Sequence, residues 1–260
     1  MVRVVQISDP HLFADPDARL RGVPTDAAFR DVLAHVDRHH GDFDLLVLTG
    51  DLAHDEDERT YERLWRHLGD RISRCRLIPG NHDQRSFLRS TFGPLVGPGA
   101  GEFVCFAQTL DNWHVLGLDT HVPGEIHGRL EPSHLQWLRS QLLAADGPTV
   151  VFMHHPPISV QSRWLDEIAL REPEAFCALV GANPGVKAIC TGHVHHEFSG
   201  HVGRAVVKCA PSTAIQFRPR TDEMQRDAIP PGYCVLELEG QAVRWRVVRL
   251  PDLHYPPEPN

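Results

Sequence analysis

Five short apolar runs, each followed at once by polar residues, constrain the fold of this chain more than any other feature. The runs are 2–7, 45–48, 75–78, 149–153 and 186–190. They are rich in Val, Ile and Leu, as strands buried inside a sheet are, and segments with helical spacing separate them. This alternation is typical of an α/β protein, and the length suits one large domain. We predict a domain over residues 1–250 and a C-terminal tail over 251–260.

Apolar residues recur at helical spacing in three of the connecting segments, 29–36, 61–68 and 135–142. Each of these segments is predicted to be an amphipathic helix that packs on the core. Thr25 and Asp26 precede the first segment and are candidate N-caps, since both residue types accept hydrogen bonds from free backbone N–H groups.

The pattern changes after about residue 197, where strands follow one another without long helices. The predicted strands are 204–209, 233–238 and 242–248. The segment 213–232 is polar and rich in proline, so we expect a long surface loop there. The last residues, 255–260, are expected to be frayed.

The composition excludes several classes of protein. A formal net charge of −8 disfavours binding to long nucleic acids, which require a surplus of Lys and Arg. The six cysteines are scattered without a C-x-x-C pair, so they are expected to be free thiols in a reducing compartment. No apolar window approaches the length of a membrane span, and no signal peptide is recognisable at the N-terminus. We therefore expect a cytoplasmic protein with neither a membrane nor a long nucleic acid as partner.

The polar residues that follow the five runs are of metal-ligand types. The clusters are Ser8-Asp9-Pro10-His11, Thr49-Gly50-Asp51, Gly80-Asn81-His82-Asp83, His154-His155-Pro156 and Gly192-His193-Val194-His195. Because ligands bind at the carboxyl ends of strands in open α/β sheets, we expect all five clusters to meet there. Carboxylate, imidazole and amide donors without a thiolate suit Mn, Fe, Zn or Co.

The spacing within these clusters adds two expectations about local geometry. In an extended chain, the D-x-H pair at 9–11 and the H-x-H pair at 193–195 each place both side chains on one face. Glycine precedes a ligand type three times, at Gly50, Gly80 and Gly192. We expect these glycines to form tight turns with unusual backbone angles.

Taken in order, the motifs D-x-H, G-D, G-N-H-D, H and G-H-x-H resemble those of the calcineurin-like metallophosphoesterase superfamily. The resemblance implies a four-layer sandwich of two mixed β-sheets flanked by helices. It also implies two divalent or mixed-valence metal ions. Carried over to this chain, one ion would be held by Asp9, His11 and His195, the other by Asn81, His154 and His193, and Asp51 would bridge them.

Within the superfamily, further motifs resemble those of the bacterial class III cyclic-nucleotide phosphodiesterases. They lie at 118–120, 128–130, 136–138, 154–157 and 230–233. This resemblance implies hydrolysis of a small phosphodiester, with 3′,5′-cyclic AMP as first choice, and it admits a homodimer. Glycerophosphodiesters, 2′,3′-cyclic nucleotides and other small phosphoesters remain alternative substrates. A metal-binding scaffold without activity is the non-enzymatic alternative.

The mechanistic hypothesis is attack by a hydroxide that bridges the two ions, since paired cations lower the pKa of a shared water. His82 is the candidate catalytic residue, and the resemblance implies that it protonates the leaving oxygen. The candidate substrate contacts are Asn81, His82, His195 and Phe217, with the Phe217 ring stacking on a nucleobase. Asp83 either orients an imidazole or fixes its loop, and His155 is expected outside the inner ligand set.

Overall fold

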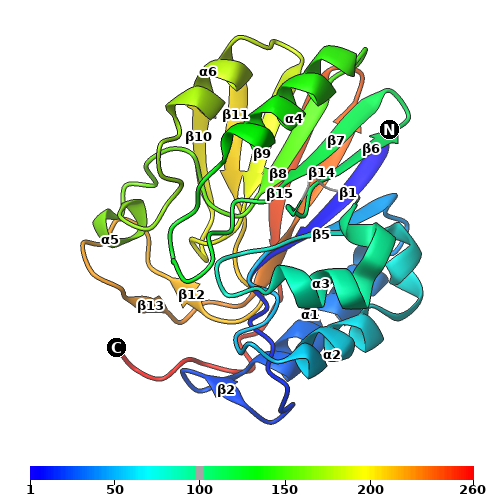
Figure 1. Ribbon diagram of the computed structural model, residues 1–260. Coiled ribbons are helices and arrows are strands. Elements are labelled where there is room, and N and C mark those ends of the chain that lie inside the picture. Colours follow the sequence, from blue (N-terminus) through cyan, green and yellow to red (C-terminus); the bar gives the residue numbers. More distant parts are fainter. Residues whose placement is uncertain (98–101) are drawn as a thin grey trace.

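The computed structural model describes residues 1–97 and 102–260, and two β-sheets form its centre (Figure 1). The first sheet has the order β15-β14-β1-β4-β5. Its strands are β1 (Val2–Ile7), β4 (Leu45–Thr49), β5 (Cys75–Ile78), β14 (Gly232–Glu239) and β15 (Ala242–Arg249). β1, β4 and β5 run parallel, whereas β14 is antiparallel to both β1 and β15.

The second sheet has the order β10-β11-β9-β8-β7-β6. Its strands are β6 (Phe106–Leu110), β7 (Trp113–Leu118), β8 (Thr149–Met153), β9 (Val186–Thr191), β10 (Phe198–Val202) and β11 (Ala205–Cys209). The four inner strands are parallel, and the edge strands β6 and β10 pair antiparallel with their neighbours. Both sheets are therefore mixed, as predicted.

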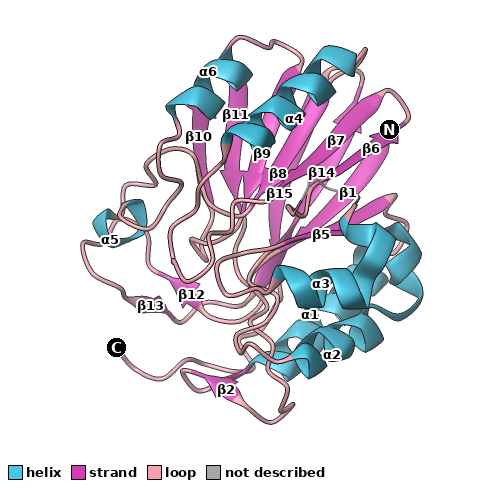
Figure 2. Cartoon of the chain, viewed as in Figure 1, coloured by secondary structure: helices cyan, strands magenta, loops and turns pink. Residues whose placement is uncertain are grey.

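Helices cover the outer face of each sheet (Figure 2). The first sheet is covered by α1 (Thr25–His40), α2 (Glu58–Leu68) and α3 (Arg85–Phe92), and the second by α4 (Pro132–Ala144) and α6 (Glu174–Gly181). Short elements lie in the connections: α5 (Arg163–Asp166), η1 (Gly69–Arg74), η2 (Gly93–Val96), β2 (Arg19–Leu20), β3 (Val23–Pro24), β12 (Gln216–Phe217) and β13 (Arg226–Asp227). No helix in the described residues has the length and hydrophobicity needed to cross a bilayer.

The alternation of side chains along the strands produces the layers. In β4, Leu45 and Val47 belong to the core between the two sheets, whereas Leu46 and Leu48 pack against the α1–α3 layer. A third core lies between the second sheet and α4 with α6. Both faces of the parallel strands are thus buried, which is why their sequences are continuous apolar runs. The predicted four-layer sandwich is confirmed.

The predicted strands and the three predicted helices are all present. The prediction of Thr25 and Asp26 as caps is wrong, because Pro24 occupies the N-cap position and makes no side-chain capping bond. Asp26 instead pairs with His67 on α2, with an oxygen–nitrogen distance of 2.6 Å. The elements β6, β7, β10, α3, α5 and α6 were not predicted from the sequence.

Two expectations about surface segments are also wrong. Residues 213–217 are buried, and 213–232 contains the ribbon β12–β13 instead of a continuous surface loop. The end of the chain is not frayed, because the Glu258 N–H donates to the Arg21 carbonyl (2.9 Å) and Asn260 bonds to Arg226. The first of these segments contributes Ile215, Phe217 and Met224 to the candidate site described below.

Candidate metal centre

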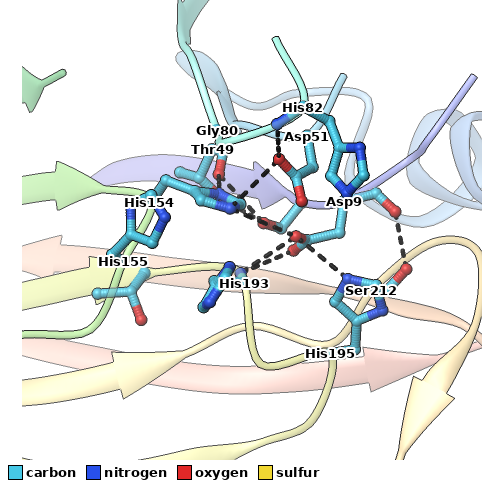
Figure 3. A network of polar contacts seen from close by, with 12 residues as sticks. Asp9, Thr49, Asp51, Gly80, His82, His154, His155, His193, His195 and Ser212 are labelled. Atoms are coloured by element: carbon cyan, nitrogen blue, oxygen red, sulfur yellow. Dashed lines mark hydrogen bonds and ion pairs between the residues drawn. The ribbon is translucent and has the colours of Figure 1, made fainter. Parts of the chain in front are cut away.

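The seven predicted ligands converge where β1, β4, β5, β8 and β9 end. Figure 3 labels five of them: Asp9, Asp51, His154, His193 and His195. They are Asp9, His11, Asp51, Asn81, His154, His193 and His195. Ligand atoms of Asp9, His11, Asp51 and His195 all lie within 4.8 Å of one another, and those of His154 and His193 form an adjacent group with His155. The His154 Nε2 atom, 3.4 Å from Asp51 Oδ1, joins the two groups.

Hydrogen bonds between the loops hold these side chains in place. The His11 N–H donates to the Asp51 carbonyl at 2.9 Å. The His193 N–H is shared between both carboxylate oxygens of Asp9, at 3.1 and 3.2 Å. The His82 N–H donates to Asp51 Oδ1 at 3.0 Å. The two carboxylates therefore position neighbouring loops while their remaining lone pairs face the centre.

Several candidate ligands have left-handed backbone angles. The φ values are 54° at Asp9, 44° at His11, 48° at Asp51, 68° at His193 and 52° at His195. The expectation that the D-x-H and H-x-H pairs lie in extended chain is wrong, because each strand has ended before its pair begins. His193 and His195 consequently belong to different groups of ligand atoms. Such angles cost about 1–3 kcal/mol each and persist where the surrounding structure enforces them.

The glycines act in two different ways. Gly50 has the predicted unusual angle, with φ of 89°. Gly80 and Gly192 do not have positive φ and are required for space instead. A Cβ atom on Gly80 would lie 2.2 Å from Asp51 Oδ1, and one on Gly192 would lie 2.0 Å from Ser8 Oγ.

Backbone carbonyl groups orient two of the imidazoles. The Nδ1 atom of His154 is 2.7 Å from the Thr49 carbonyl, and that of His195 is 2.9 Å from the Ile215 carbonyl. A carbonyl only accepts, so Nδ1 carries the hydrogen, and in the neutral ring Nε2 presents its lone pair to the centre. This arrangement is the usual support for a histidine that binds a metal.

Three acceptor atoms of the centre are buried without a hydrogen-bond partner among the described residues. They are Asn81 Oδ1, His154 Nε2 and His193 Nε2. Leaving a buried polar atom unsatisfied costs about 1–3 kcal/mol, so a cluster of such atoms requires a reason. A metal cation would satisfy all three, and the residues present fit such an ion.

The electrostatics of the centre also favour a bound cation. Burial opposes a charge on His154, but the Asp51 and Asp9 carboxylates outweigh it and raise the pKa of His154 to about 9. Burial, followed by the nearby His154 charge, lowers the pKa of His193 to about 3. The buried carboxylates therefore create a field that favours a positive charge at the centre.

His155 lies beside the centre, yet both of its ring nitrogens are engaged elsewhere. Nε2 is 3.0 Å from the Ile126 carbonyl and therefore donates, while Nδ1 is 2.8 Å from Thr120 Oγ1 and accepts. The side chain is fully buried. Its geometry is that of a support for the loop that carries Ile126, not of a ligand.

Asp83 connects the second and third clusters. Its carboxylate accepts hydrogen bonds from the N–H groups of Leu52, Ala53 and Gly80 and from the Tyr61 hydroxyl. Burial, followed by the Asp51 charge, raises the pKa of Asp83 to about 6. Of the two roles considered for Asp83, the contacts correspond to fixing its loop.

His82 lies at the edge of the centre, partly buried. Its ring stacks on His54, with centroids 4.8 Å apart and planes at 24°, and meets His11 edge-on at 5.0 Å. His54 Nδ1 is 3.2 Å from His11 Nδ1, so His54 also contacts a candidate ligand. His54 was missed in the sequence, although it stands only three residues after Asp51.

A pocket of about 410 Å³ opens beside the centre, a size that suits a small molecule. His82, His54 and several candidate ligands line one part of it, Arg21 contributes as well, and the other side chains are apolar: Leu20, Ile126, Trp164, Leu165, Ile168, Ile215, Phe217 and Met224. Ile126 and Met224 are 57% and 46% exposed, which places apolar groups at its mouth. Phe217 is only 8% exposed, and one face of its ring is covered by His195.

Comparison with known proteins agrees with this geometry. The sequence model of the calcineurin-like phosphoesterase family matches residues 2–197. The chain belongs to that family. It is 33% identical to the 3′,5′-cyclic adenosine monophosphate phosphodiesterase CpdA of Escherichia coli, with 99% of this chain and 93% of the relative covered. It is 34% identical to CpdA of Pseudomonas aeruginosa, over 91% and 85% of the two chains.

Two solved structures of other proteins share the fold. A dimetal phosphatase from Danio rerio superposes with a TM-score of 0.67 at 15% identity, covering 95% of this chain and 98% of that one. A purple acid phosphatase from yellow lupin gives a TM-score of 0.71 at 12% identity, over 98% and 52% of the two chains. The predicted superfamily and its cyclic-nucleotide branch are confirmed, and the protein is a metallophosphoesterase.

Proposed function

We propose that the protein is a phosphodiesterase that hydrolyses 3′,5′-cyclic AMP. The observation that carries this proposal is a set of unpaired buried acceptors beside a small, largely apolar pocket. Relatives that are cyclic AMP phosphodiesterases and match 91–99% of this chain support it. The pocket size favours a small phosphodiester over a long polymer, as does the net charge of −8.

We propose that two ions chosen from Mn, Fe, Zn and Co bind at the centre. One would be held by Asp9, His11 and His195, the other by Asn81, His154 and His193, and both by Asp51. Two observations support this division. Ligand atoms of Asp9, His11 and His195 lie close to those of Asp51. Asn81, His154 and His193 each have a buried atom without a hydrogen-bond partner among the described residues. When bound, such ions supply Lewis-acid activation of water and charge stabilisation for the phosphoryl group.

His82 is proposed as the residue that protonates the leaving oxygen. Its backbone is held by Asp51, whereas its ring lines the pocket and is only partly buried. The ring can therefore meet a substrate without leaving its loop. Stacking against His54 restricts the directions in which the ring turns.

The apolar walls are proposed to receive the nucleobase. Trp164 and Met224 stand with Phe217 on the pocket lining, and Trp164 meets Phe217 edge-on at 5.0 Å. Because His195 covers one face of Phe217, we propose that Phe217 borders the base while Trp164 and Met224 supply more of the contact area.

The domain assignment, one domain over 1–250 and a tail over 251–260, remains a proposal. It is supported by β14 and β15, which complete the first sheet by pairing with β1. A cytoplasmic location is likewise proposed, because all six cysteines are free thiols.

A hydrolysis panel with the Mn-loaded protein tests the substrate. It compares 3′,5′-cyclic AMP with 2′,3′-cyclic AMP, glycerophosphodiesters and 4-nitrophenyl phosphate, a monoester. We expect the highest kcat/KM for the 3′,5′-cyclic nucleotide. A preference for the monoester would contradict a phosphodiesterase, and a preference for another diester would replace the substrate. No turnover of any of these substrates by protein that holds Mn would favour the metal-binding scaffold.

A further inference from the structure

Arg21 is the one permanently charged cation among the described residues that line the pocket. The other cationic groups on this lining are imidazoles, most of them candidate metal ligands. Arg21 is exposed, and its guanidinium forms no ion pair with any described residue. An unpaired guanidinium beside a phosphoesterase centre is free to meet an anionic substrate.

The backbone holds Arg21 in a defined position. It stands in the two-residue turn between β2 and β3, where Leu20 pairs with Val23. Its φ is 50° and that of Gly22 is 88°, as in a type I′ hairpin turn. Arginine is not a residue that favours positive φ, so this position costs about 1–2 kcal/mol relative to glycine or asparagine. Such a residue calls for a functional explanation.

The C-terminal tail fastens this turn from outside the pocket. The Glu258 N–H donates to the Arg21 carbonyl at 2.9 Å. The tail also packs tightly on the turn, since a Cβ atom added to Gly22 would lie 3.0 Å from Glu258 Cγ. From inside the hairpin, the Arg19 guanidinium donates to the Gly22 carbonyl at 2.9 Å.

The same tail also contacts the β12–β13 ribbon. Asn260 accepts from the Arg226 N–H at 2.6 Å and donates to the Arg226 carbonyl at 3.1 Å. Arg226 pairs with Phe217 in the β12–β13 ribbon, and Phe217 lines the pocket. In Figure 1 the red end of the chain passes between β2 and β13, in agreement with these bonds. Residues 258–260 thus form a strap that joins two walls of the pocket.

We propose that Arg21 is a substrate-binding residue that contacts the anionic phosphodiester, and that the strap holds it in place. The inference rests on the proposed phosphodiesterase function. A guanidinium matches the oxygens of a phosphate with two parallel N–H donors, which an imidazole does not offer. In a protein of net charge −8, this cation also gives the pocket mouth a local attraction for anions.

The first test compares Arg21→Gln with Arg220→Gln. Both substitutions remove one charge at a residue with positive φ, but Arg220 does not line the pocket. The substrate is bis(4-nitrophenyl) phosphate, a diester that does not depend on recognition of a nucleoside. We expect Arg21→Gln to raise KM about ten-fold and to change kcat less than two-fold, because one charge-assisted bond is lost. Arg21→Lys should recover part of the affinity, and Arg220→Gln should leave KM unchanged.

The second test concerns the strap. Glu258→Pro removes the N–H that binds the Arg21 carbonyl, whereas Glu258→Gln keeps it and changes only the side-chain charge. We expect Glu258→Pro to raise KM about three-fold. This rise is smaller than that expected for Arg21→Gln, because the guanidinium remains present. Glu258→Gln should not raise KM. Added to Arg21→Gln, Glu258→Pro should have no further effect, because both act on one contact.

Binding of inorganic phosphate to the Mn-loaded protein, measured by calorimetry, separates failure of this inference from failure of the proposed function. Weaker phosphate binding in Arg21→Gln supports the inference even if cyclic AMP is not hydrolysed. Unchanged KM and unchanged phosphate affinity in Arg21→Gln would overturn it. An equal rise of KM in Arg220→Gln would also overturn it, since the effect would then follow net charge and not the pocket.

Discussion

The ring of Phe217 lies face to face with the imidazole of His195, with centroids 4.4 Å apart and planes inclined by 13°. The segment that carries Phe217 also supplies the Ile215 carbonyl that accepts from His195 Nδ1. Both contacts restrain the ring of this candidate ligand, one through its face and the other through Nδ1. A segment expected to be a surface loop is therefore part of the support of the metal centre.

Replacing Phe217 by Leu should weaken metal binding about ten-fold, because outer contacts of a ligand histidine set its orientation. Competition with a chromogenic chelator measures the affinity. Phe217→Tyr, which keeps the ring, is the matched control and should bind metal like the wild type. If Phe217→Leu binds metal normally and raises KM only for nucleotide substrates, the ring contacts the base instead.

Neighbouring histidines should differ sharply in their effect on metal content. His154→Ala removes an unpaired inward-facing nitrogen and should lower the bound metal by about one ion per chain, as measured by elemental analysis. His155→Ala should retain both ions, because both of its nitrogens bond to protein groups. Equal loss of metal in the two variants would show that His155 is a ligand.

His82→Ala should lower kcat about 10²–10⁴-fold while the metal content stays at the wild-type value, as expected for loss of a general acid. The defect should be smaller for bis(4-nitrophenyl) phosphate than for cyclic AMP, because 4-nitrophenolate leaves without protonation. Steady-state kinetics and elemental analysis of the same preparation provide the comparison. A defect that follows metal loss would assign His82 to the ligands.

Removing metal should destabilise the fold, since the Asp9 and Asp51 carboxylates are buried and face unpaired acceptors. Thermal unfolding with EDTA, followed by readdition of Mn²⁺, measures the effect. When the free concentration of an ion is 100 times its dissociation constant, binding stabilises the native state by about 2.7 kcal/mol. The His193→Ala variant should gain less from Mn²⁺ than the wild type, and an identical gain would argue against the proposed division of ligands.

His134 should make the protein sensitive to acid. Burial lowers the pKa of His134 from 6.5 to about 4. At a pH between these two pKa values, His134 binds a proton in the unfolded chain but not in the folded chain. The free energy of unfolding therefore falls as the pH falls. His134 lowers the free energy of unfolding by about 2 kcal/mol at pH 5, and this effect is absent above pH 6.5.

His134→Gln is the test of this pH effect. Glutamine can still accept from the Glu131 N–H, which now donates to His134 Nδ1 at 2.9 Å, so the helix cap is kept. Urea unfolding at pH 7.5 and pH 5 should show a smaller acid loss in the variant. The same loss in both proteins would mean that His134 is not the responsible group.

The ligand types and the parallel strands could be predicted because both are local properties of the sequence. A buried parallel strand is a continuous apolar run; His154 follows its run directly, and Asp9 follows its run after Ser8. β7 was missed because its sequence includes His114 and Gly117, which interrupt the run. Gly117 is tolerated there because the ring of Phe106 on β6 fills the space where its Cβ atom would stand.

The sequence by itself determined the fold class and the chemistry of the centre, since five apolar runs end in oxygen and nitrogen donors. Only the tertiary structure decided which donors are available. His154 and His155 are identical residues in adjacent positions. Among the described residues, only Nδ1 of His154 is engaged, by the Thr49 carbonyl at the end of β4, whereas both ring nitrogens of His155 are bonded. The tertiary structure also brought Glu258 into contact with Arg21, which lines the pocket. Contacts between residues that are far apart in the sequence depend on how the layers pack. The spacing of residues along the chain does not encode this packing.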